Sequence, residues 1–166
     1  MRSDIERAAH VVRAATEFDW TWTIDDLLRF SEQIGWRLGS PDDKYPTLNT
    51  NLDINRTDAS VELDNTIRPG HPRPLDRIWF LASDVVLDDP SVQAELDRVF
   101  DDLAQRVFEV VGQRPNGWWL EPRRGLRWEL PTVVVTLNVS DASVSVYLVS
   151  PEHQRWLDEI EASGDS

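Results

Sequence analysis

The chain has 166 residues, a net charge of −13, 40% hydrophobic and 28% charged residues, and no cysteine. This composition is typical of one globular domain rather than of a disordered chain. The absence of cysteine excludes disulfides and thiolate chemistry. No apolar run reaches the roughly 18 residues of a membrane span. The net negative charge disfavours nonspecific binding to nucleic-acid phosphates.

The N-terminal residues predict no secretory signal. They read "MRSDIERAAHVVRAATE", which lacks the continuous apolar stretch of a signal peptide. We therefore expect a cytoplasmic protein with a single domain over residues 1–166, ordered from about 4 to 161 and frayed at 162–166.

Two helices are expected first. One spans about residues 4–17, begins with the capping-box pattern "SDIE" and has a thin apolar stripe, so it should lie on the outside. The other is capped by Thr23, carries Trp22 as part of a hydrophobic staple and ends before Gly35. Trp22 is therefore expected to be structural.

Strands are expected after Gly35. A short strand fits residues 36–38, and the alternation of apolar and polar residues in 47–54 and 59–64 predicts a hairpin. A proline-rich loop over 65–75 follows, and the continuous apolar run at 77–83 is typical of a central strand.

A long helix over 90–111 is the clearest element of the second half. Pro90 suits its first position and Gly112 its end, with apolar residues at helical spacing between them. "WWLEP" and "LRWEL" predict two short strands, and residues 132–139 and 143–149 predict a final hairpin.

A last helix is expected to open at Ser150-Pro151 and to place Trp156, Leu157 and Ile160 on its inner face. The expected order is α-α-β-β-β-α-β-β-β-β-α. It predicts an α+β fold, a mainly antiparallel sheet of about six to seven strands with helices packed on one side.

No catalytic motif stands out. The chain lacks a nucleophile elbow, a P-loop and a dinucleotide-binding loop. Of the three histidines, His10 is expected on a solvated helix face and His153 at a surface or rim position, and only His71, in the proline-rich loop, is considered as a site residue. Adjacent acids fit helix starts and solvated faces. We therefore predict no catalytic residue, no metal site, no cofactor and no enzyme activity.

The tryptophans suggest a recognition surface instead. Trp22, Trp79 and Trp156 are expected in the core, but adjacent residues of a strand point to opposite faces, so Trp118 and Trp119 cannot both be buried on one side. Arginine is enriched nearby, although the chain uses arginine in place of lysine almost throughout. The predicted partner-binding residues are Trp118, Trp119, Arg123, Arg124, Arg127, Arg73 and His71.

Three segments resemble a known family. "FDWTWTIDDLLRFSEQIGW", "LRWELP" and "SDASVSVYLVSPEHQRWLD" resemble an uncharacterised family of small, acidic actinobacterial proteins, a domain of unknown function, over about residues 15–160. The resemblance implies no activity and no catalytic residue. Small acidic α+β proteins of this style look like immunity proteins or secretion chaperones, an analogy at the level of the fold.

The sequence therefore predicts a non-enzymatic, cytoplasmic protein-interaction module, such as an immunity protein or a dedicated chaperone of a secreted partner. Its acidic surface would steer a basic protein, with no nucleic acid and no membrane involved. Two alternatives remain open: an enzyme with a non-local site around His71 and carboxylates, and an inhibitor whose acids mimic a nucleic acid.

Overall fold

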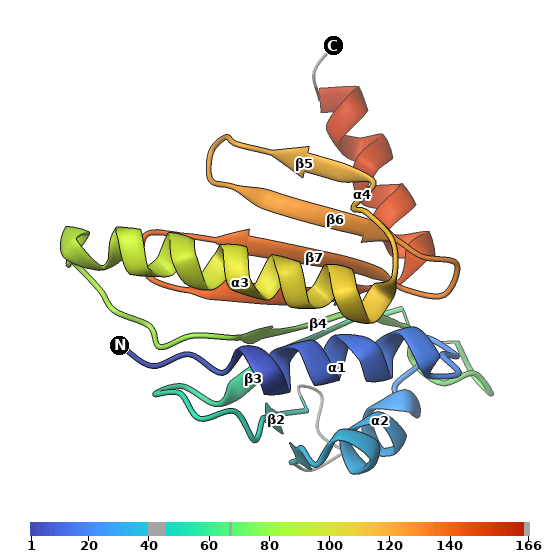
Figure 1. Ribbon diagram of the computed structural model, residues 1–166. Coiled ribbons are helices and arrows are strands. Elements are labelled where there is room, and N and C mark those ends of the chain that lie inside the picture. Colours follow the sequence, from blue (N-terminus) through green and yellow to red (C-terminus); the bar gives the residue numbers. More distant parts are fainter. Residues whose placement is uncertain (40–45, 67, 165–166) are drawn as a thin grey trace.

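The computed structural model describes residues 1–39, 46–66 and 68–164. Within these ranges one antiparallel sheet of eight strands, one or two more than expected, combines with four α-helices (Figure 1). The elements are α1 (Ile5–Glu17), α2 (Asp26–Ile34), β1 (Arg37–Leu38), β2 (Leu48–Asn49), β3 (Asp58–Leu63), β4 (Leu75–Leu81), α3 (Gln93–Val111) after a 3-10 turn (Pro90–Val92), β5 (Gly117–Trp119), β6 (Gly125–Glu129), β7 (Val134–Val139), β8 (Val144–Val149) and α4 (Pro151–Gly164).

The sheet has the order β1-β2-β3-β4-β8-β7-β6-β5, and every neighbouring pair is antiparallel. The expected final hairpin forms as β7–β8. Strand β2 pairs with β3 as expected, but it spans only Leu48–Asn49 instead of residues 47–54. The continuous apolar run falls in the central strand β4, where Ile78 and Phe80 are buried on one face and Trp79 is half-buried on the other.

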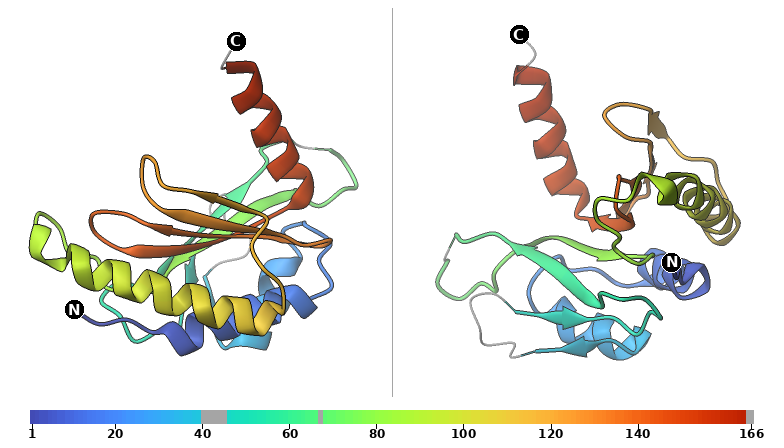
Figure 2. Two further views of the ribbon diagram at one scale, coloured as in Figure 1. Left: turned by 45° about the horizontal axis from the view of Figure 1, so that its top comes forward. Right: turned by 90° about the vertical axis from the view of Figure 1, so that its left-hand side faces the viewer.

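Helices α1 and α3 lie side by side on one face of the sheet, which we call the inner face (Figure 2). The core lies between them and the strands. Its fully buried side chains include Phe80 and Leu148 from the sheet and Leu96 and Leu103 from α3. Each such side chain stabilises the fold by about 1.5–3 kcal/mol through burial alone.

The expectation that the first helix lies on the outside is wrong. Six side chains of α1 are buried, four of them alanines and two valines. The stripe looked thin because its residues are small, and small residues let α1 lie close to α3 and the sheet. The expected cap is also wrong, since Asp4 accepts the N–H of Arg7 while Ser3 forms a bridge with Ser83.

The second helix begins at Asp26 rather than after a Thr23 cap. Trp22 has a structural role, as expected: it stacks on Trp20 at 4.3 Å between ring centroids, and its indole N–H donates to the carbonyl of Thr132. Gly35 ends the helix with a φ of 78°, a left-handed conformation that glycine adopts without strain.

The opposite face of the sheet, which we call the outer face, is only partly covered. Trp79 was expected in the core, but it lies half-buried on this face and stacks on Tyr147 of β8. Val134 and Val149 are buried there, beside the start of α4. The helices thus lie on both sides of the sheet, in contrast to the expected single side.

Helix α4 projects away from the sheet toward the C-terminus (Figures 1 and 2). Its predicted inner face is wrong: Trp156 is 53% and Ile160 49% exposed, and only Gln154 is buried among the described residues of the helix. The helix turns away from the outer face, so Trp156 and Ile160 stay exposed and only Leu157 of the predicted apolar face is half-buried. It continues to Gly164, beyond the start of the expected frayed tail.

Among the described residues, no helix is both long and apolar enough to cross a membrane.

Candidate functional site

The two adjacent tryptophans of β5 point to opposite faces. Trp118 lies on the inner-face side and is 71% exposed. Trp119 is half-buried, and its ring lies against Gly125 of β6, where a larger residue would clash with it. Trp118 is therefore the member of the pair that is open to a partner.

The arginines near β5 are engaged within the protein. Arg124 contacts Asp101 at 2.9 Å and Asp97 at 3.3 Å, and its guanidinium lies 4.7 Å from the ring centroid of Phe100. These contacts tie the start of β6 to α3.

The other two arginines of this segment have similar roles. Arg123 pairs with Asp141, and Arg127 contacts Asp158 of α4 at 3.3 Å. The arginines thus connect β6 and its preceding turn to α3, α4 and the β7–β8 turn rather than forming a free basic patch.

His71 and Arg73 lie elsewhere, on the loop between β3 and β4, across β8, β7 and β6 from the edge strand. Arg73 donates to the side-chain oxygen of Asn65. The structure therefore does not bring the seven predicted binding residues together. It separates an aromatic sheet edge from a loop that borders a pocket.

That pocket has a volume of about 660 Å³ and lies between the β3–β4 loop and the first turns of α4. Carboxylates dominate its polar lining, and the indoles of Trp22 and Trp156 contribute apolar wall. The ionisable residues that line it are Glu62, Asp64, Arg68, His71, Asp76, Glu152 and His153.

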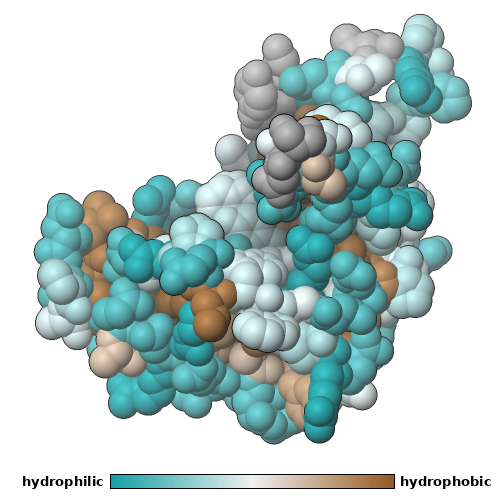
Figure 3. Space-filling model, turned by 90° about the horizontal axis from the view of Figure 1, so that it is seen from above, coloured by the Kyte–Doolittle hydropathy of each residue, from teal (hydrophilic) through white to brown (hydrophobic). Residues whose placement is uncertain are grey.

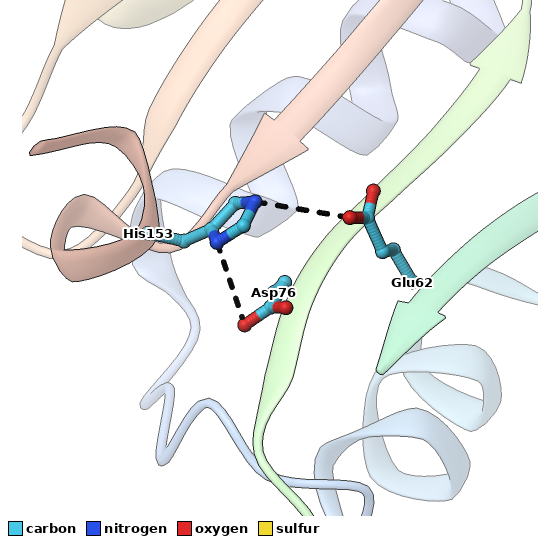
Figure 4. Close-up of side chains that lie close together, drawn as sticks. All are labelled: Glu62, Asp76 and His153. Atoms are coloured by element: carbon cyan, nitrogen blue, oxygen red, sulfur yellow. Dashed lines mark ion pairs between the residues drawn. The ribbon is translucent and has the colours of Figure 1, made fainter. Parts of the chain in front are cut away.

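His153 lies between two carboxylates in this pocket (Figure 4). Its Nδ1 is 3.6 Å from Asp76 of β4, and its Nε2 is 3.9 Å from Glu62 of β3. Its side chain is only 10% exposed, so it lies deeper than the surface or rim position expected for it. Trp156, one helical turn on, covers one side of the ring with centroids 5.5 Å apart.

The local sequence explains why the histidine turns inward. The hydroxyl of Ser150 accepts the backbone N–H of His153, so Ser150 caps α4 and places His153 in its first turn. That turn sits on the ends of β4 and β8, next to Asp76. Glu62 and Asp76 come from the consecutive paired strands β3 and β4, but His153 comes from the C-terminal helix α4, so no spacing rule could find the complete cluster.

The electrostatics of the cluster favour a cation. Burial is the largest cause and raises the pKa of Asp76, while the nearby His153 opposes it as the second-largest cause. The negative charges of Asp64 and Glu62 raise the pKa further, and Arg77, the smallest of these causes, lowers it. Arg77 pairs with Oε2 of Glu62 and leaves Oε1 facing the histidine. Such a site can hold a metal ion or move a proton.

A family model described as a family of unknown function (DUF6301) matches residues 6–150. The chain belongs to this family. The match includes β3 and β4, which carry Glu62 and Asp76, and ends just before α4, which carries His153. Neither a curated protein nor a solved structure matches the chain.

Proposed function

We propose that the chain is a cytoplasmic protein-interaction module, without catalysis of its own, that binds a basic partner protein at the sheet edge formed by β5. The observation that carries this proposal is a cross-strand row of apolar side chains that continues beyond the helices that cover it. The row consists of Phe80, Val146, Leu137, Leu126 and Trp118.

The burial of this row changes along its length. Its first three members are fully buried under the helices, Leu126 is half-buried, and Trp118 is 71% exposed. Leu120, just beyond β5, is 62% exposed. An apolar side chain that extends a core row gains burial when another protein covers it, and tryptophan is the residue type most enriched at binding hot spots.

Charge supports a basic partner. The chain carries 30 acidic residues against 17 basic ones, and Arg123, Arg124 and Arg127, in and just before β6, already pair with acids. The face that includes this edge is mostly hydrophilic, with small apolar patches (Figure 3). A positively charged protein would be steered to such a surface and then anchored by the exposed aromatic ring.

Immunity proteins and dedicated secretion chaperones are two classes that fit this description. Both hold one partner in a stable complex, and an acidic surface with an apolar anchor suits a basic toxin or effector. We propose these classes by analogy with other small, acidic α+β proteins, since fold alone does not determine function.

The test is affinity capture of partners from the native host with the wild type and two variants, Trp118→Ser and Leu87→Ser. Leu87 is the matched control, because it is as exposed as Trp118, at 71%, and lies on the segment between β4 and α3. We expect wild type and Leu87→Ser to retain the same basic protein, and Trp118→Ser to lose at least tenfold in affinity. Added salt should slow association.

Both substitutions replace exposed side chains, so the free energy of unfolding should change by less than about 0.5 kcal/mol. A partner that Trp118→Ser and Leu87→Ser bind equally well would contradict the proposed surface. The absence of any stable partner at micromolar concentration would contradict the module itself.

A second candidate function is catalysis or ligand binding around His71. The pocket does contain His71, Arg68 and the shielded Asp76, as a non-local active site would require. His71 itself is exposed at the rim. If this candidate is right, a small molecule should remain bound through purification, and native mass spectrometry should show its loss in His71→Ala.

The nucleic-acid-mimic hypothesis has less support. Asp97 and Asp101 share a face of α3, but both contact Arg124, which neutralises the row that would have to resemble phosphates.

A further inference from the structure

We propose that Glu62, Asp76 and His153 form a binding site for a divalent transition-metal ion, with Zn²⁺ as the reference ion. Each residue offers one ligand atom, and the three atoms all lie within 4.8 Å of one another. The site goes beyond the proposed partner surface and shares no residue with it.

The buried imidazole is the feature that distinguishes this cluster from an ordinary group of acids. Nε2 of His153 is inaccessible to solvent and has no hydrogen-bond partner among the described residues. Its distance of 3.9 Å from Glu62 is too long for a hydrogen bond. A buried polar atom without a partner is costly, and a metal ion bound to a ring nitrogen removes that cost.

The surrounding residues hold the ligands in place. Arg77 binds one oxygen of Glu62 and leaves the other directed at the histidine, and Trp156 fixes one face of the imidazole. Outer contacts of this kind orient metal ligands.

Binding requires the three ligand atoms to move closer together. Ligand atoms at about 2.0–2.1 Å from a tetrahedral ion stand roughly 3.4 Å apart, whereas the three ligand atoms here lie within 4.8 Å of one another. Side-chain rotations of Glu62 and Asp76 can bring the carboxylates inward by the remaining distance. A bound cation also compensates the desolvated charge of Asp76, which burial disfavours.

The donor set indicates the class of metal. One imidazole and two carboxylates suit Zn²⁺, Co²⁺, Mn²⁺ or Fe²⁺, whereas Mg²⁺ and Ca²⁺ prefer oxygen ligands alone. Three protein ligands leave at least one coordination position, and it would face the pocket, where water or a small anionic molecule could occupy it.

The experiment is a Zn²⁺ titration of the full chain, freed of metal with a chelator, in competition with a chromophoric indicator. We expect one ion per chain in the wild type, and binding at least tenfold weaker in His153→Gln, Glu62→Gln and Asp76→Asn. His10→Gln is the control, because His10 is an exposed histidine on α1 and should leave the affinity unchanged. Mg²⁺ at the same concentration should not displace Zn²⁺.

A second measurement tests the same site in case one of the variants folds poorly. Co²⁺ should give a visible absorption spectrum of a nitrogen and oxygen site in the wild type and in His10→Gln, and this spectrum should be lost in His153→Gln. Trp118→Ser should bind Zn²⁺ like the wild type, which separates this proposal from the partner surface. The proposal is overturned if the wild type binds no ion at micromolar concentration, or if His153→Gln and His10→Gln bind equally well.

Discussion

At the scale of the residue, Asp26 is the best example of one side chain that organises several others. It is completely buried, and its carboxylate accepts the backbone N–H of Thr21 and of Trp22 and the hydroxyl of Thr21. Arg29 adds a contact of 2.7 Å. The carboxylate therefore fixes the chain that leads into α2 and holds Trp22 in place, a role that sequence reasoning had divided between Thr23 and a hydrophobic staple.

Asp26→Ala should lower the free energy of unfolding by about 3 kcal/mol, because it leaves two backbone N–H groups without their acceptor and Arg29 without its partner. Asp25→Ala is the matched control, since the neighbouring Asp25 is exposed and makes no side-chain cap. Urea unfolding of both variants measures the difference. Equal losses would show that the buried carboxylate has no special role.

His153 shows the limit of prediction for single residues. Its helical position was predicted correctly, but its direction depends on the strands that α4 starts from. Glu62 and Asp76 look like ordinary strand acids until β3 and β4 pair and bring them to the same histidine. A pocket built from three separate elements has no signature in the spacing of the chain.

At the scale of the element, periodicity located most helices and strands but did not determine what covers them. Helix α3 and strands β4, β7 and β8 were predicted well, because a long apolar pattern is rarely compatible with both helix and strand. The faces of α1 and α4 were misassigned for opposite reasons. Small alanines hid a buried face in α1, and large apolar residues suggested a buried face in α4 where none forms.

The contact between β5 and β6 provides an element-scale prediction. Gly125→Ala places a methyl group where the Trp119 ring lies, so it should lower the free energy of unfolding by about 1–3 kcal/mol. Gly117→Ala is the control on the facing strand, because its nearest atom would be the Cβ of Arg127 at 3.6 Å, an ordinary contact.

Chemical unfolding measures both glycine variants, and a double variant tests the cause. The double variant, Trp119→Ala with Gly125→Ala, should lose less free energy of unfolding than the sum of the losses of the two single variants, because the clash needs both side chains. Strict additivity would mean that the methyl group disturbs something other than the ring.

At the scale of the whole molecule, the excess of carboxylates means that the fold should lose stability mainly at low pH. Burial alone would raise the pKa of Asp4, but the N–H groups of Asp53 and Arg7 and the Arg7 guanidinium hold it below its ordinary value of 3.8. Hydrogen bonds from Thr66 and from Ser91 likewise lower the pKa of Asp64 and of Asp89. These groups stabilise the fold above their unfolded pKa, and this stabilisation is lost as the pH falls through the lowered native values.

Asp4→Asn should therefore be less stable than the wild type by about 1 kcal/mol at pH 7, the usual weight of a charged group at a helix N-terminus. The deficit should shrink as the pH falls below 3.8, where the wild-type carboxyl also becomes neutral. Urea unfolding at pH 7 and at pH 2.5 tests this sign. A deficit of the same size at both values would exclude the ionised carboxylate as its source.

The two ends of the sheet are short: β1 has two residues and β5 has three. An edge this brief offers few free backbone groups to an incoming strand, and Pro115 and Pro122 flank β5 on either side. Copies of the chain are thereby hindered from joining into longer sheets, even though Trp118 stands uncovered at one end. A partner at that edge must recognise side chains rather than continue the β-ladder, so its specificity should depend on the shape of its own apolar pocket.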